Sequence, residues 1–86
     1  MIQINKIVDC LIEEIGEEKD RRAYEKIANA FSEHPNMVIG GLKRAQRYTV
    51  GKPKEDTRRY FMVVIKNLAQ KHRIYVFESW LSPRLN

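Results

Sequence analysis

Apolar residues recur at intervals of three and four along most of the chain, the pattern of helices that bury one face. The stretch with the clearest organisation is DTRRYFMVVIKNLAQK, residues 56–71. At 100° per residue, its apolar side chains fall mainly on one face and its basic and amide side chains on the other. No Gly or Pro interrupts the run, and Asp56 or Thr57 can cap its first free amides. The pattern predicts a helix over residues 57–71.

The same spacing predicts three further helices, over residues 4–15, 21–32 and 35–47. Gly16 follows the first of them, where a left-handed C-cap is common. Asp20 is placed to cap the second, and Pro35 suits the first turn of the third. We therefore expect an all-α fold, a small bundle of four main helices with a packed C-terminal segment, forming a single domain over residues 1–86.

The C-terminal segment has a mixed pattern. Residues 74–77 are β-branched and aromatic, which favours a strand, but no second strand is predicted to pair with it. The helical spacing of Ile74, Phe77 and Leu81 is the competing pattern. Phe77, Trp80 and Leu81 are too apolar to remain exposed. We expect them to pack on the bundle or on a partner, which includes a second copy of the chain, so that the protein is a monomer or a homodimer.

Charge divides the chain into two halves. Residues 1–35 carry five Lys and Arg against eight Asp and Glu, a net charge of −3, whereas residues 36–86 carry eleven against three, a net charge of +8. Such an asymmetry favours a polyanionic partner for the second half, nucleic acid before membrane.

Several other classes of function have no residues to support them. No apolar run reaches the roughly 20 residues of a membrane span, and the acidic N-terminal stretch does not resemble a signal peptide, so a cytoplasmic protein is expected. Cys10 is the single cysteine and is expected to be a partly exposed, unreactive thiol. His34 and His72 are isolated from other metal-binding residues. We expect neither a metal nor another cofactor, and no enzymatic activity.

The helix over residues 35–47 carries cations on the side opposite its apolar stripe. Gly40 lies on this basic side, where the missing side chain would let a phosphate backbone approach. The alternative is that the pair Gly40-Gly41 forms a tight helix–helix contact or a break in the helix. A helix-turn-helix with this helix as the recognition element is conceivable, although Ser32 stands where glycine is usual.

The polar stretch TVGKPKED, residues 49–56, follows as a basic loop that we expect to be flexible. Tyrosines flank it on both sides and could stack on bases, or seal the edge of the core. The residues predicted to contact nucleic acid are Gly40, Lys43, Arg44, Arg47, Tyr48, Lys52, Lys54, Arg58, Arg59 and Lys66.

About half of the chain, from Ala23 to Lys71 and especially the stretch RRYFMVVIKNLAQKH at residues 58–72, resembles the small helical C-terminal domains of bacterial, plasmid and phage replication initiation proteins, the DnaD-like group. The residues that carry the similarity are an aromatic pair, Tyr60 and Phe61, an aliphatic helix, and the Lys66-Asn67 step. The resemblance implies DNA binding and contact with the replication machinery. Residues and resemblance together predict a non-catalytic nucleic-acid-binding module, with DNA favoured. The alternative is a protein-interaction module whose basic face binds an acidic protein.

Overall fold

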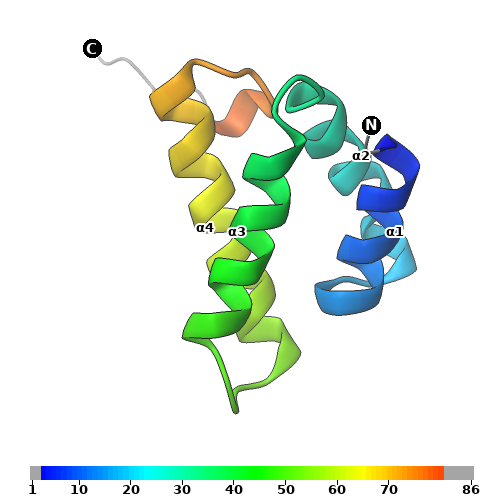
Figure 1. Ribbon diagram of the computed structural model, residues 1–86, viewed down its shortest axis with the longest axis vertical. Coiled ribbons are helices and arrows are strands. Elements are labelled where there is room, and N and C mark those ends of the chain that lie inside the picture. The colour runs from blue at the N-terminus through cyan, green and yellow to red at the C-terminus, as the bar shows by residue number, and fades with distance from the viewer. Residues whose placement is uncertain (1–2, 81–86) are drawn as a thin grey trace.

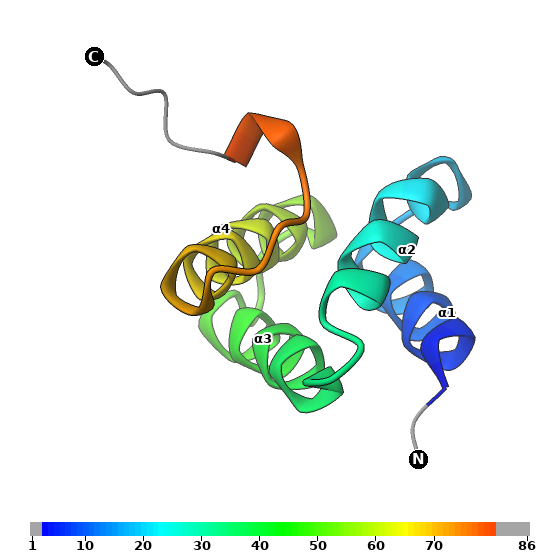
Figure 2. The same ribbon diagram turned by 90° about the horizontal axis from the view of Figure 1, so that it is seen from above.

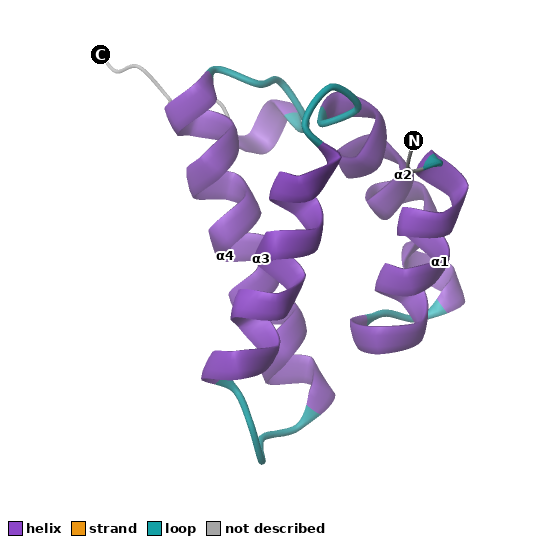
Figure 3. Ribbon diagram, viewed as in Figure 1, coloured by secondary structure: helices purple, strands orange, loops and turns teal. Residues whose placement is uncertain are grey.

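The computed structural model describes residues 3–80, and this part of the chain consists of helices joined by short connections (Figures 1 and 3). Two single 3₁₀ turns, η1 and η2, accompany the helices, and no strand occurs within residues 3–80. The elements are α1 (Ile4–Ile15), η1 (Glu18–Asp20), α2 (Arg21–Ala30), α3 (Pro35–Tyr48), α4 (Lys54–His72) and η2 (Glu78–Trp80). The all-α bundle of four helices predicted from the sequence is confirmed.

The bundle is built from two helical hairpins. α1 packs mainly against α2, and α3 packs mainly against α4, so that the two pairs lie side by side (Figures 1 and 2). α2 and α3, the pair required by a helix-turn-helix, contact each other much less. Because each hairpin comes from one half of the chain, the charge asymmetry of the sequence becomes an asymmetry between an acidic and a basic hairpin.

All four helices contribute fully buried side chains to one core, among them Leu11, Ile15, Tyr24, Ile27, Phe31, Val38, Phe61 and Ile65. Tyr24 on α2 meets Phe61 on α4 edge to face, with ring centroids 6.3 Å apart. Burial raises the pKa of Tyr24 to about 12, with the Asp20 carboxylate adding to the rise and Arg58 opposing it. The phenol is therefore neutral at physiological pH, as its place between the two hairpins requires.

The predicted caps of α1 and α2 are wrong. Gly16 has extended backbone angles, φ −117° and ψ −169°, and not a left-handed cap. A side chain at Gly16 would overlap the ring of Tyr24, so glycine is needed here for close packing. The Asp20 carboxylate accepts a hydrogen bond from the Glu17 amide at 3.0 Å and thereby closes the η1 turn. It makes no side-chain cap bond to α2, because the chain already has helical angles at Asp20.

α4 begins at Lys54, three residues before the predicted start, and neither Asp56 nor Thr57 caps it. Thr57 is instead buried, and its hydroxyl shares a hydrogen bond with the hydroxyl of Thr49. Glu55 and Asp56 lie in the first turn, where negative charge is favourable to the helix dipole. α2 also ends at Ala30, two residues before its predicted end.

Residues 74–77 are neither the strand nor the helix that the sequence left open. They have no regular secondary structure and follow Arg73, which ends α4 in the left-handed conformation, and Val76 is buried against the core. The side-chain amide of Gln70 donates to the carbonyl of Trp80 at 3.2 Å, and the ammonium of Lys26 lies 5.8 Å from the Phe77 ring. This segment therefore joins α4 to α2.

The two adjacent glycines of α3 have different surroundings. A Cβ at Gly41 would lie 3.2 Å from Cδ1 of Ile65 and 3.4 Å from Cγ1 of Val64, whereas a Cβ at Gly40 would meet nothing within 4 Å. Gly41 is therefore the helix–helix contact that the sequence offered as one alternative. Gly40 faces open space, as the approach of a phosphate backbone to this side of the helix would require.

Leucine substitution should separate the two glycines. Gly40→Leu should raise the free energy of unfolding by roughly 0.5–1 kcal/mol, because glycine loses more conformational entropy on entering a helix. Gly41→Leu should lower it by roughly 1–3 kcal/mol, because the new side chain has to force α3 away from α4. Urea denaturation followed by circular dichroism measures both changes. Equal effects at the two positions would contradict the packing role of Gly41.

Candidate nucleic-acid interface

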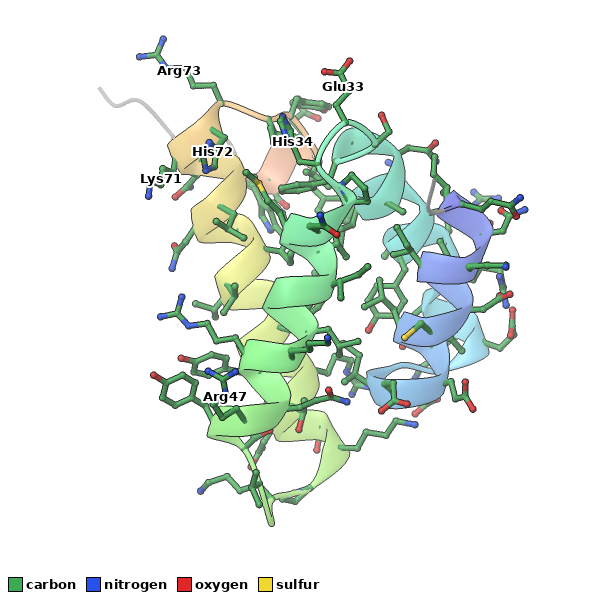
Figure 4. All side chains as sticks on the ribbon, viewed as in Figure 1. Glu33, His34, Arg47, Lys71, His72 and Arg73 are labelled. Carbon is green, nitrogen blue, oxygen red and sulfur yellow. The ribbon has the colours of Figure 1, made fainter. Side chains whose placement is uncertain are left out.

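The cations of α3 lie where the sequence pattern predicted them. Val38, Leu42 and Ala45 are buried against the core, while the basic side chains on the opposite side are exposed. Figure 4 shows Arg47 near the end of α3 that leads into the connection to α4, projecting away from the acidic hairpin. The exposed basic residues of this helix are Lys43, Arg44 and Arg47.

The connection between α3 and α4 is shorter than predicted and forms a defined turn. It spans only residues 49–53, because Lys54 already belongs to α4. The amide of Lys52 donates to the carbonyl of Thr49 at 3.0 Å, and Gly51 has a φ of +81°, which favours glycine. The Thr49 hydroxyl also donates to the Ala45 carbonyl at 2.8 Å. Lys52 is therefore presented on a closed turn and not on a long flexible loop.

The two tyrosines that flank this turn lie against each other. The rings of Tyr48 and Tyr60 are stacked, with centroids 5.4 Å apart and an interplanar angle of 21°. Tyr48 keeps 59% of its surface exposed, and the guanidinium of Arg44 lies 5.9 Å from its ring centroid. Tyr60 is half-buried and packs on the edge of the core. The pair combines the two roles considered for it, since Tyr60 covers core and Tyr48 offers an aromatic surface.

A shallow hollow of about 410 Å³ opens beside the stacked tyrosines. Lys52 and Arg59 supply its positive charge, and Asp56 and Val63 also line it. Neither Asp56 nor Val63 was predicted from the sequence to belong to the site. Val63 is 56% exposed, and its signal was an apolar residue on the polar face of a helix, between Arg59 and Lys66.

Most of the predicted cations are free to bind a ligand. Within residues 3–80, Lys43, Arg44, Arg47, Lys52, Lys54, Arg59 and Lys66 are all exposed and take part in none of the ion pairs. Arg58 differs from them. Its guanidinium lies 4.0 Å from the carboxylates of both Asp20 and Glu55, and its side chain is only 28% exposed. Arg58 therefore links the two hairpins and does not belong to the group of exposed cations without an ion pair.

A second group of basic residues lies at the far end of α4. Figure 4 shows Lys71, His72 and Arg73 at the opposite end of the molecule from Arg47. His34 lies near that same end, in the connection between α2 and α3. No group of three or more His, Cys, Asp or Glu side chains among the described residues is arranged to hold a metal ion.

The aromatic residues expected to bind a partner are partly used inside the molecule. Phe77 and Trp80 pack edge to face, with centroids 4.8 Å apart, and both are half-buried against the core. Leu81 lies outside the described residues. Tyr75 beside them is 63% exposed. Packing on the bundle, one of the two alternatives for Phe77 and Trp80, is the one observed.

Comparisons with protein-family models, curated proteins and solved structures found no match to this chain. None of the helices described is both long enough and apolar enough to cross a membrane. The interface is therefore interpreted from its own chemistry.

Cys10 is exposed on α1, at the edge of an apolar groove between α1 and α3. Partial burial raises the pKa of its thiol, and the carboxylates of Glu14 and Glu13 raise it further. The thiolate is the reactive form, so both effects suppress nucleophilic chemistry at neutral pH.

Alkylation of Cys10 by iodoacetamide should reach half its maximal rate at a pH above about 8.5, the pKa of an unperturbed thiol. Glu14→Gln should shift this profile to lower pH, because it removes a negative charge that opposes the thiolate. Glu33→Gln, on the connection between α2 and α3, is the matched control and should leave the profile unchanged. A midpoint below that of a free thiol would show that Cys10 is activated.

Proposed function

We propose that this protein is a non-catalytic nucleic-acid-binding module that contacts phosphates with its basic hairpin. The observation that carries the proposal is the set of exposed, unpaired cations on α3, on the following turn and on α4. Surface cations without carboxylate partners keep their full attraction for phosphate, and their binding releases counterions from the nucleic acid.

The distribution of these cations supports a backbone-tracking mode of binding. Lys43, Arg44 and Arg47 follow one side of α3, and Lys52 lies on the turn. Lys54 begins α4, on which Arg59 and Lys66 lie one heptad apart. Lysine and arginine on such a surface neutralise phosphates and carry little sequence information. Binding should therefore depend steeply on salt and discriminate weakly between sequences.

The resemblance of residues 58–72 to DnaD-like domains favours DNA as the nucleic acid and a role in replication. Tyr60, Phe61, Lys66 and Asn67 carry that resemblance. In the fold, Tyr60 and Lys66 lie on or beside the proposed surface, whereas Phe61 is a core residue.

Charge reversal on α3 tests the proposal. The variant Lys43→Glu, Arg44→Glu, Arg47→Glu should abolish measurable binding of a labelled DNA oligomer in fluorescence anisotropy at physiological salt. At low salt, any residual binding should have a shallower dependence on salt, with the slope of log K against log[salt] reduced by about 0.7 to 0.9 for each phosphate that is no longer neutralised. Circular dichroism should show an unchanged helical content, because all three side chains are exposed.

The matched control reverses three exposed cations on the acidic hairpin, Lys6, Lys19 and Arg22, and changes the net charge by the same amount. This control should weaken binding far less, because it changes only the long-range field. Equal losses in the two triple variants would show that the α3 cations do not touch the nucleic acid. No binding of the unmodified protein to any nucleic acid at low salt would assign the basic hairpin to an acidic protein partner.

A further inference from the structure

We infer that the hollow beside Tyr48 and Tyr60 binds an unpaired base, so that the ligand is a single-stranded nucleic acid. The inference rests on the proposed function and adds to it the class of nucleic acid and the site that recognises it. It depends on four features of one small region: an exposed aromatic surface, a shallow hollow beside it, and both an acidic residue and cations in the lining of that hollow.

The exposed aromatic surface is preformed. Tyr48 stacks on Tyr60 at 5.4 Å and the guanidinium of Arg44 lies 5.9 Å from the Tyr48 centroid, so a base would stack on the part of the ring that these neighbours leave exposed. Even so, 59% of the residue remains exposed, and Val63 at the edge of the same hollow is 56% exposed. An aromatic ring held in place by a neighbour loses little conformational entropy when a base stacks on it. Base–aromatic stacking also tolerates any sequence, because every base has a π face.

The lining of the hollow suits a base whose flanking phosphates meet positive charge. The hollow, of about 410 Å³, is shallow and open, so it can seat the face of a base without enclosing it. Asp56 is part of its lining, and a carboxylate can accept a hydrogen bond from a ring N–H or an exocyclic amino group of a base. Lys52 and Arg59 line the hollow as well, and Arg47 is exposed nearby on α3, so phosphates on either side of a bound base would meet positive charge.

This arrangement discriminates between single strands and duplex. In a duplex the bases are paired and stacked on one another, and a ring at the surface of a helical hairpin can reach a base face only after that base is unstacked. A single strand offers its bases without this cost, while both forms offer phosphates to the cations. The stacked tyrosines should therefore add affinity for single strands alone.

The test compares three labelled ligands of equal length in fluorescence anisotropy: oligothymidine, an abasic strand with the same phosphates, and a duplex. We expect the tightest binding for oligothymidine. Tyr48→Ala should weaken oligothymidine binding by roughly 5- to 100-fold, the effect of losing one base–aromatic stack. It should leave binding of the abasic strand and the salt dependence unchanged, because no phosphate contact is removed.

Tyr75→Ala is the matched control, because Tyr75 is equally exposed, at 63%, but lies beyond the far end of α4. This variant should bind all three ligands as the unmodified protein does. Equal affinity for oligothymidine and the abasic strand, or no effect of Tyr48→Ala, would overturn the stacking site while leaving the phosphate contacts in place. Failure of all three ligands to bind at low salt would overturn the proposed function itself.

Discussion

The close approach of α3 and α4 at Gly41 determines the geometry of the basic hairpin. The distance between packed helices depends on the side chains at the contact, and a Cβ at Gly41 would already press on Ile65. The hydrogen bond between Thr49 and Thr57 then joins the same two helices where α3 ends and α4 begins. Between these two points the register of the helices is fixed, and this register brings Tyr48 against Tyr60. The proposed interface thus depends on a packing contact that contains no functional residue.

The sequence predicted the helices because each one buries a continuous apolar stripe, and the period of such a stripe is a local property of the chain. It also predicted which side of α3 is basic, since Val38, Leu42 and Ala45 define the buried side. These are features that a single helix determines without reference to the rest of the fold.

The features that could not be predicted involve residues distant in sequence. Arg58 and Arg59 are neighbours with the same local sequence pattern. Asp20 from the acidic hairpin nevertheless pairs with Arg58 and not with Arg59. Gly16 looked like a helix cap because its neighbours in sequence suggest one, whereas the Tyr24 ring is what excludes a side chain there. The stacking of Tyr48 on Tyr60 likewise follows from the register of two helices. No pattern within one segment contains that information.

The separation of acidic and basic residues into two hairpins gives the molecule a negative and a positive side. A dipolar molecule that approaches a polyanion experiences a torque as well as an attraction, so its basic hairpin turns toward the polyanion before any contact is made. In the proposed complex the acidic hairpin, on which Asp9, Glu13, Glu14, Glu17 and Glu18 are exposed, would face away into solvent. A bound molecule would therefore present its negative side outward. Along one polyanion, the like charges of these outward-facing hairpins would repel each other and keep neighbouring molecules apart. A second ligand of positive charge would be drawn to the outer surface that they form.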